Sequence, residues 1–327
     1  MLSAPVAVID IGSNSIKVLI ATRDEHGSVT PLKIQAVDAR ISAGISQDSP
    51  VLSETGMTRG LEAIQSLLAT VAEFKPVRTI LVATSAVRDA VNGPEFCARV
   101  HSATGLEVRI LTGNEEANLI GLGLTADPAL RGLQDFYLFD LGGGSLECFA
   151  FRQRRIEQAS SLRLGCVRLM EKFVENPDAA LDPSTVQQIE GYSREAVAQS
   201  AFAFTLSAGS TVVGTGGTLT TVRAIFGARE MKSFEETEPV IRVTELRQLL
   251  NVLGEMPLAR RKQISGLPRA RADVFPVALA TLIGVAEAGG FKAYHHSVYN
   301  LRYGVASEIL NVDLQANGFR QETADER

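Results

Sequence analysis

Two short segments of the sequence place an aspartate, a glycine and a serine at matching positions. Residues 10–15 read Asp-Ile-Gly-Ser-Asn-Ser, and residues 140–145 read Asp-Leu-Gly-Gly-Gly-Ser. In both segments an apolar run leads to the aspartate and an alternating apolar pattern follows the serine, which predicts strand, tight turn and strand. Glycines allow backbone N–H groups to converge on an anion at close range. Each segment is therefore a candidate phosphate-binding turn.

The two aspartates, Asp10 and Asp140, suit a different part of the same chemistry. A carboxylate repels phosphate, but it can hold the Mg²⁺ ion that accompanies a phosphate group. A glycine turn alone is weak support, because hairpins also use glycine for purely steric reasons. The repetition of the segment favours phosphate binding over a purely steric role, since a duplicated domain would set the two turns face to face around one phosphate chain. Both aspartates would then converge on the metal.

A third segment with close-spaced glycines lies at residues 212–220, where it contains Gly214, Gly216 and Gly217. Its pattern predicts a strand, a turn and a helix that continues to Phe226. The N–H groups at the start of such a helix can meet an anion or the sugar end of a nucleotide. The glycine spacing fits neither the Walker pattern nor the Rossmann pattern, so neither kind of nucleotide site is supported.

Arg88 comes just after a predicted buried strand at residues 79–83, at the strand end where α/β proteins place groups that contact ligands. Its guanidinium could grip two phosphate oxygens at once. A surface salt bridge to Asp89 or Glu95 is an equally good interpretation from the sequence alone, and both stay open.

Two adjacent glutamates open the helix predicted to follow Gly113. Glu115 is interpreted as a capping residue, the usual role of a carboxylate in a first helical turn. Glu116 is a candidate catalytic residue if the preceding strand brings this turn to the floor of the cleft. Its carboxylate could then orient and deprotonate a water molecule for in-line attack on a terminal phosphorus.

Basic residues gather in the C-terminal third of the chain, between two predicted helices. They are Arg260, Arg261, Lys262, Arg269 and Arg271. This cluster could flank a track for a polyanion, but a solvated helix end is the favoured interpretation.

Cysteines and histidines give no sign of a metal centre. Cys97, Cys148 and Cys166 lack CxxC or His-Cys spacing, so we expect neither disulfides nor a zinc site. His295 and His296 are adjacent on a predicted strand and point to opposite faces, which argues against joint metal binding.

The composition predicts a soluble protein with two domains. A chain of 327 residues with 45% hydrophobic content can form two cores, and its net charge of −5 argues against a general nucleic-acid binder. The longest apolar stretch, Val274 to Gly290, is interrupted by Pro276 and Glu287 and is too short to span a membrane. The first residues run into the first predicted strand without a basic region, an apolar core or a cleavage site, so we do not expect export. We expect a cytoplasmic protein that binds neither nucleic acid nor membrane.

A polar connection at residues 127–135 separates the two halves of the chain. We therefore predict an N-terminal domain at residues 1–126 and a C-terminal domain at residues 127–303. A short helix at about residues 304–316 is expected to return to the N-terminal domain.

Several ordered segments resemble the exopolyphosphatase / guanosine pentaphosphate phosphohydrolase family. They are residues 10–15, 113–117, 140–147, 164–168 and 214–218. Ordered motifs over most of the chain make the resemblance specific. The family belongs to the actin-like and sugar-kinase-like ATPase superfamily. The resemblance therefore implies an α/β fold of two duplicated actin-like, ribonuclease H-like domains with an interdomain cleft.

The resemblance implies a hydrolase, because family members remove terminal phosphate from inorganic polyphosphate or the 5′ γ-phosphate from guanosine pentaphosphate. We expect an Mg²⁺-dependent exopolyphosphatase, with guanosine pentaphosphate hydrolysis as the second choice. A nucleotide-dependent kinase and a non-catalytic sensor of guanosine tetraphosphate or pentaphosphate stay open. Assembly into a homodimer also stays open.

Carried over residue by residue, the resemblance assigns Glu116 as the catalytic base and Asp140 as a metal-linked aspartate, beside Asp10. It assigns Glu147 as an acidic partner in the site and Arg88 as a phosphate-gripping arginine. The phosphate-binding candidates are Ser13, Asn14, Ser15, Gly142, Gly143, Gly144, Ser145, Gly214, Gly216 and Gly217.

The sequence departs from the family pattern in two respects. Longer members carry additional C-terminal helical domains, and we expect their loss to shorten any track for long polymers. The family's closing Gly-Leu-Arg-Glu-Gly phrase reads Asn-Leu-Arg-Tyr-Gly at residues 300–304, so Tyr303 replaces an acid.

Overall fold

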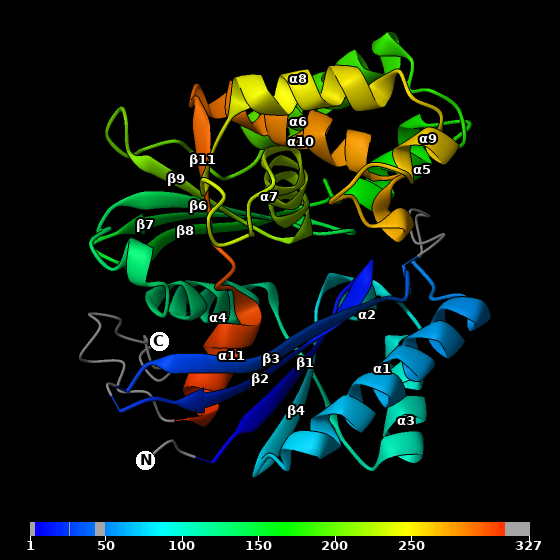
Figure 1. The fold of residues 1–327 in the computed structure, drawn as a ribbon, viewed down its shortest axis with the longest axis vertical. Coiled ribbons are helices and arrows are strands. Elements are labelled where there is room, and N and C mark those ends of the chain that lie inside the picture. The colour runs from blue at the N-terminus through cyan, green and yellow to red at the C-terminus, as the bar shows by residue number, and fades with distance from the viewer. Residues whose placement is uncertain (1–3, 26, 43–49, 311–327) are drawn as a thin grey trace.

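Two mixed β-sheets with helices around them make up the protein (Figure 1). The computed structural model describes residues 4–25, 27–42 and 50–310. The first sheet has the strand order β3-β2-β1-β4-β5. Its strands are β1 (Val6–Ile11), β2 (Ser15–Arg23), β3 (Val29–Asp38), β4 (Arg78–Ala83) and β5 (Val108–Ile110). Every residue of the central strand β1 is buried, so the turn that follows begins inside the molecule.

The second sheet has the order β10-β11-β9-β6-β7-β8. Its strands are β6 (Phe136–Leu141), β7 (Leu146–Arg152), β8 (Arg155–Leu162), β9 (Thr211–Thr215), β10 (Val240–Arg242) and β11 (Ala293–His296). Strand β6 pairs antiparallel with β7 and parallel with β9, as β1 pairs with β2 and β4. The predicted α/β fold with a repeated hairpin is therefore confirmed. The turn at residues 12–15 is called the first glycine turn and that at residues 142–145 the second.

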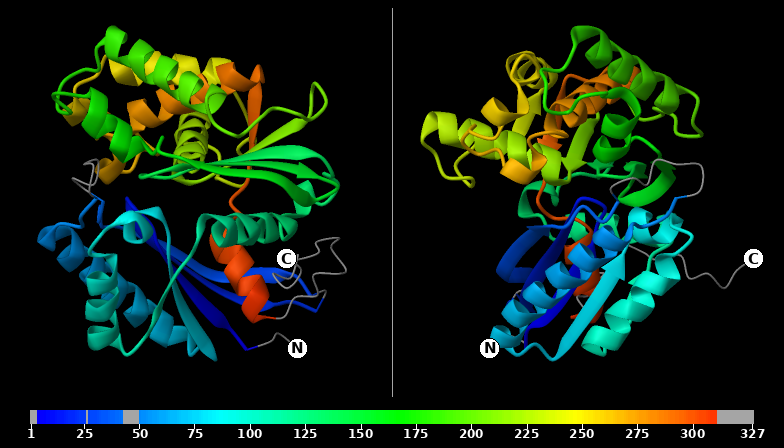
Figure 2. Two further views of the ribbon diagram at one scale, coloured as in Figure 1. Left: turned by 180° about the vertical axis from the view of Figure 1, so that it is seen from behind. Right: turned by 90° about the vertical axis from the view of Figure 1, so that its right-hand side faces the viewer.

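Helices flank both sheets (Figures 1 and 2). They are α1 (Glu54–Phe74), α2 (Ser85–Asp89), α3 (Gly93–Thr104), α4 (Gly113–Thr125), α5 (Cys166–Phe173), α6 (Pro183–Ala198), α7 (Gly217–Glu230), α8 (Val243–Gly254), α9 (Leu258–Arg261), α10 (Phe275–Gly289) and α11 (Leu301–Ile309), with 3₁₀ turns η1 (Pro128–Leu130) and η2 (Arg269–Arg271). The apolar helix α10 packs against α6 and α8 as part of the core. Among the described helices, none combines the length and apolar character that a membrane crossing requires.

Helices α4 and α11 lie between the two sheets (Figures 1 and 2) and contact each other closely. Glycines make that approach possible: a Cβ added at Gly123 would lie 2.1 Å from the carbonyl oxygen of Asn300, and one at Gly304 would lie 1.8 Å from that of Leu119. Helix α11 also contacts β1. The predicted domain boundaries stay predictions, and residues 311–316 of the predicted terminal helix lie outside the described residues.

The chain passes between the sheets once after α4 and once before α11. A buried hydrogen bond joins the two passages, donated by the Ser297 hydroxyl to Asp127 Oδ2 at 2.7 Å. Because both passages and both helices meet here, this region is where the halves of the molecule are covalently and tightly connected.

Replacing Gly304 with alanine tests the backbone contact between α4 and α11. We expect Gly304→Ala to lose roughly 1–3 kcal/mol of stability, because the methyl group overpacks the interface, and to lower Tm by several degrees. Thermal unfolding followed by circular dichroism measures the change. The matched control is Gly191→Ala in α6, where a Cβ would meet open space and the helix should be unchanged or slightly stabilised. Equal Tm values for Gly304→Ala and the parent would show that this contact is not needed.

Candidate active site

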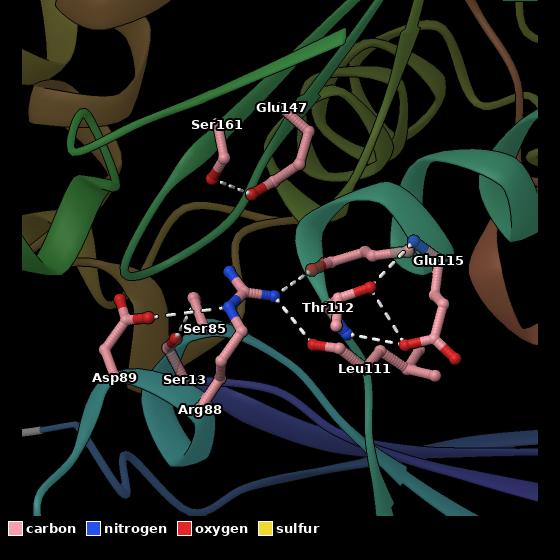
Figure 3. Close-up of polar contacts among 10 residues, drawn as sticks. Ser13, Ser85, Arg88, Asp89, Leu111, Thr112, Glu115, Glu147 and Ser161 are labelled. Atoms are coloured by element: carbon pink, nitrogen blue, oxygen red, sulfur yellow. Dashed lines mark hydrogen bonds and ion pairs between the residues drawn. The ribbon is translucent and has the colours of Figure 1, made fainter. Parts of the chain in front are cut away.

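The two glycine turns face each other across one cavity. A Cβ added at Gly143 would lie 3.1 Å from Ser13 Cβ, and one added at Gly144 would lie 2.9 Å from Ser13 Oγ and 3.0 Å from Ser85 Oγ. The hydroxyls of Ser13 and Ser85 are themselves 3.3 Å apart (Figure 3). The absence of side chains at these glycines is what lets the two halves of the molecule approach so closely here.

Most of the sequence-predicted site residues line this cavity. They are Asp10, Ser13, Asn14, Ser15, Glu116, Asp140, Gly142, Gly143, Ser145, Glu147, Gly216 and Gly217. Gly144 contributes through the turn contact described above. Gly214 does not line the cavity: it lies within β9, where a Cβ would clash with Leu219 at 2.2 Å, so its place in the fold is that of a packing residue.

The second glycine turn is held in place by the start of α5. Backbone N–H groups of Cys166 and Val167 donate to the carbonyls of Gly142 and Gly143, at 3.1 and 2.9 Å. The Arg168 guanidinium donates to the Gly144 carbonyl at 3.1 Å. Within the turn, the Gly142 N–H donates to the Ser145 carbonyl at 3.0 Å. The N–H groups of Gly143 and Gly144 are therefore the ones that the turn can offer to an anion.

The first glycine turn is held by the chain that follows β3. The Asn14 carbonyl accepts hydrogen bonds from the N–H groups of Ala39 and Arg40, at 3.1 and 2.9 Å. The Ser13 carbonyl accepts from both the N–H and the hydroxyl of Ser42. The amide oxygen and nitrogen of the Asn14 side chain are buried and have no partner among the described residues. That side chain is therefore positioned for a ligand with both donors and acceptors.

Asp10, Asp140 and Lys17 line the cavity, and Arg302 lies close enough for its charge to act on them. Asp10 is buried, whereas Asp140 and Lys17 are half-buried. Asp10 lies opposite Lys17 in the β1–β2 ladder, and Asp140 lies at the matching position of β6. Burial raises the pKa of both aspartates, and the charges of Lys17 and Arg302 oppose that rise. Burial, followed by the charge of Arg302, lowers the pKa of Lys17 to about 8. Arg302 is buried too, and its Nε and Nη1 atoms have no partner in the described part of the chain.

The cations of this site were missed by reasoning from the sequence. Lys17 carries one usable signal, because it occupies the hairpin position that Glu147 occupies in the second repeat. Arg271 lines the cavity and packs its guanidinium against Gly217, where an added Cβ would lie 1.9 Å from Nη1. The solvated-helix interpretation is thus wrong for Arg271. The same interpretation is wrong for Arg261, whose side chain is buried and whose guanidinium donates to four backbone carbonyls.

Arg88 forms an ion pair with the candidate catalytic residue, Glu116. Its Nη1 atom lies 2.8 Å from Glu116 Oε2 and also donates to the Leu111 carbonyl at 3.1 Å. Its Nε atom lies 3.5 Å from Asp89 Oδ1, whereas Glu95 binds Arg99 instead. The salt bridge to Asp89, one of the interpretations that the sequence left open, is therefore present. The contact with Glu116 is shorter.

The two glutamates at the start of α4 have different surroundings. Glu115 closes a capping box with Thr112, as predicted: it accepts from the Thr112 N–H at 2.9 Å, and its own N–H donates to the Thr112 hydroxyl at 3.2 Å. Glu116 is buried at the cavity. Burial, and then the charge of Glu147, raise the pKa of Glu116 well above its ordinary range, while Arg88 opposes the rise.

Glu147 comes from the opposite wall, on β7, and accepts a hydrogen bond from the Ser161 hydroxyl at 3.0 Å (Figure 3). Burial is the main cause that raises the pKa of Glu147 to about 7, with a further contribution from Asp140. Near neutral pH, Glu116 and Glu147 therefore form an acidic pair that retains protons more readily than exposed carboxyls do. A carboxylate pair of this kind suits proton transfer at neutral pH.

The cysteines and His296 lie outside the cavity lining. The three cysteines are unbonded, and Cys148 and Cys166 are buried. His296 is buried beside Arg223 and Thr220. No cluster of three or more His, Cys, Asp or Glu residues suited to a metal occurs in the described part of the chain.

Several solved structures share the fold of this chain. An exopolyphosphatase from Cytophaga hutchinsonii superposes with a TM-score of 0.83 at 23% identity, over 94% of this chain and 98% of that one. The Ppx/GppA family member of Aquifex aeolicus gives 0.76 at 24% identity, over 96% and 99%. An exopolyphosphatase-like protein gives 0.80 at 24% identity, over 94% and 97%. These likenesses show that the chain shares one fold with these proteins.

The sequence itself gives the family. Residues 4–312 match the Ppx/GppA phosphatase family, and this chain belongs to it. The resemblance inferred from the ordered motifs is thereby confirmed, and phosphohydrolase activity is supported at the level of the family.

The raised pKa of Glu147 predicts a pH-dependent stability. The folded state holds this proton more tightly than the unfolded state, whose glutamate has a pKa of about 4.5. The stability that protonated Glu147 contributes is therefore complete below pH 4.5 and is lost as pH rises through about 7. Relative to Glu147→Gln, we expect the parent's unfolding free energy to fall over this window by at most about 3 kcal/mol.

Urea unfolding at pH 5, 6, 7 and 8 measures this difference. The exposed acid Glu62 provides the control, and Glu62→Gln should follow the pH profile of the parent. A parent and a Glu147→Gln variant with parallel profiles would contradict the protonation of Glu147 in the folded protein.

Proposed function

We propose that this chain is a phosphoanhydride hydrolase that releases terminal orthophosphate from inorganic polyphosphate. One observation carries the proposal: the Glu116 carboxylate is buried at the cavity between two glycine turns and is held there by Arg88. Two structures of the same fold are described as an exopolyphosphatase and an exopolyphosphatase-like protein, which supports the choice of substrate.

The attacking water is activated at Glu116. Arg88 binds Oε2, so Oε1 is the carboxylate oxygen that can accept a hydrogen bond from water. A base works best when its pKa approaches the working pH, and the burial of Glu116 raises its pKa in that direction. As water attacks the terminal phosphorus, its proton passes to Glu116 and the bridging P–O bond breaks, so that orthophosphate is released and the shortened chain leaves with the bridging oxygen. In this proposal Arg88 positions the base instead of gripping phosphate itself.

The charge of the phosphate chain meets donors on all sides of the cavity. Lys17 and Arg271 line the cavity, Arg271 at the edge formed by Gly217, and the buried Arg302 adds a third positive charge close to Asp10. The Asn14 amide and the N–H groups of both turns add neutral donors. In phosphoryl transfer, fixed donors of this kind stabilise charge on the equatorial oxygens of the transferred group.

Asp10 and Asp140 fit a Mg²⁺ ion bound together with the substrate. Mg²⁺ commonly uses one or two carboxylates and completes its shell with water and phosphate oxygens. Two buried oxygens without partners among the described residues, Asn14 Oδ1 and Thr215 Oγ1, add to the available donor set. When bound, the ion would neutralise negative charge on the phosphates. Magnesium dependence, cytoplasmic location and homodimer formation stay predictions.

Guanosine pentaphosphate is the second candidate substrate. Gly216 and Gly217 line the cavity at the start of α7, where the sequence pattern favours an anion or the sugar end of a nucleotide. A nucleotide-dependent kinase or a sensor of guanosine tetraphosphate or pentaphosphate could use the same cavity, and the assays below separate them from a hydrolase.

Removing the carboxylate of Glu116 tests the proposed base. We expect Glu116→Gln to lower kcat for orthophosphate release by roughly 10²–10⁴-fold, the usual contribution of a positioned base. The assay compares tripolyphosphate, long-chain polyphosphate and guanosine pentaphosphate with water as the acceptor. Glu115→Gln is the matched control, since glutamine also serves in a capping box and Glu115 lies outside the cavity lining.

The outcomes distinguish the candidates. A kinase would release little orthophosphate without an acceptor, and a sensor would bind guanosine pentaphosphate without turnover. Activity in Glu116→Gln equal to that in Glu115→Gln would refute the role assigned to Glu116.

The magnesium proposal predicts that chelation abolishes activity and that added Mg²⁺ restores it. Asp140→Asn removes one of the two carboxylates, so we expect the Mg²⁺ concentration for half-maximal activity to rise at least tenfold. Titration of orthophosphate release with Mg²⁺ measures it, with Asp135→Asn, at an exposed position outside the cavity, as control. Full activity in the presence of excess chelator would exclude a magnesium requirement.

A further inference from the structure

Arg40 connects the two halves of the molecule at a point far along the chain from both glycine turns. Its guanidinium forms a two-pronged ion pair with Asp273, with Nη1 2.5 Å from Oδ2 and Nη2 bonded to Oδ1. Nη2 also donates to the Ala270 carbonyl. The side chains of Arg40 and Asp273 keep only 25% and 14% of their surface exposed. Paired, partly shielded contacts of this geometry are among the stronger ion pairs in proteins.

The backbone of Arg40 is tied to the first glycine turn. Its N–H donates to the Asn14 carbonyl at 2.9 Å, beside the bond from Ala39. Arg40 has a φ of 45°, in the left-handed region, which is unfavourable for a non-glycine residue. Glycine would adopt this backbone without strain, so an arginine here implies that its side chain contributes something that glycine lacks.

The partner of Arg40 is tied to the opposite wall of the cavity. Asp273 follows Arg271 by two residues, and Arg271 reaches the cavity at Gly217. From the other side, Arg261 donates to the carbonyls of Ala272 and Asp273, at 3.2 and 3.3 Å. The segment that carries Arg271 is therefore fixed between Arg261, from its own half of the molecule, and Arg40, from the other half.

The ion pair lies away from the place where the halves are connected. Figures 1 and 2 show α4 and α11 at one side of the space between the sheets, whereas the end of β3 meets the segment between α9 and α10 at the other side. The hydrogen bond from Ser297 to Asp127 belongs to the first side. Arg40 and Asp273 therefore join the halves where no chain passage does so.

We propose that Arg40 and Asp273 form a latch that positions the first glycine turn and Arg271 around the same phosphate chain. The effect that we expect on KM rests on the proposed polyphosphate hydrolysis. With the latch formed, Asn14 and Arg271 are presented to the substrate together. Without it, each half keeps its own phosphate contacts but loses their mutual alignment, so the loss falls mainly on substrate binding.

Kinetic analysis of Arg40→Ala and Asp273→Ala tests the latch. We expect KM for tripolyphosphate to rise about tenfold in each, equivalent to about 1.4 kcal/mol, with kcat changed less than threefold because Glu116 and Arg88 are untouched. The charge-swapped double variant Arg40→Asp/Asp273→Arg should recover part of the loss relative to the single swaps. The control is Arg99→Ala, which breaks a similar two-pronged pair with Glu54 between α1 and α3.

A KM equal to that of the parent in both latch variants, or an equal rise in Arg99→Ala, would overturn the proposal. So would a fall in kcat with KM unchanged, because the latch is assigned to binding. A swap that recovers nothing would likewise show that the pairing itself is not the cause.

Amide hydrogen exchange without ligand tests the latch independently of activity. Arg40→Ala should speed exchange at residues 13–15 and 270–273 relative to the parent, and Arg99→Ala should not. If the parent hydrolyses nothing, this measurement still decides for or against the latch, while the proposed function alone fails. If the parent hydrolyses polyphosphate and exchange is unchanged in Arg40→Ala, the latch alone fails.

Discussion

Two carboxylates that share one cavity between the halves of the molecule constrain everything around them. Asp10 and Asp140 occupy matching positions near the ends of equivalent strands and share one cavity, where the loss of hydration makes their negative charges costly. Lys17 and Arg302 compensate that charge from within the protein. An arrangement with two anions, two cations and several unpartnered polar atoms is suited to a ligand that is itself charged and brings its own counter-ion.

The repeat explains the symmetry of the site, and its departures from symmetry explain the chemistry. Both hairpins offer an aspartate and a glycine turn, so a phosphate chain can be approached from both sides. At the next equivalent position, however, one hairpin carries Lys17 and the other carries Glu147. The cation favours phosphate, whereas the acid raises the pKa of Glu116 across the cavity. One wall therefore favours binding and the other favours proton transfer.

The sequence predicted those parts of the fold that depend on local pattern. Hairpins follow from alternation and glycine, and the capping role of Glu115 follows from its place in a first turn. The pairing of Arg88 with Glu116 could not be predicted from the sequence, because it depends on how β4 and the start of α4 lie beside each other in the folded chain. The fold class and family are confirmed, and most predicted site residues line one cavity.

The unpredicted residues are those whose contacts are long-range. Arg271 and Arg261 lie in one basic cluster of the sequence, yet one faces the cavity and the other binds carbonyls in the interior. Charge count cannot separate such neighbours, because their roles depend on which segments fold against them. Arg40 gives no signal at all, since its partner is distant in the sequence and its backbone geometry appears only in the structure.

A crystal structure of the Glu116→Gln variant with tripolyphosphate and Mg²⁺ tests most directly whether the two turns serve one substrate. We predict a terminal phosphate within hydrogen-bond distance of both glycine turns, next to the substituted side chain. A phosphate bound to one turn alone, or bound outside the cavity, would contradict a shared site.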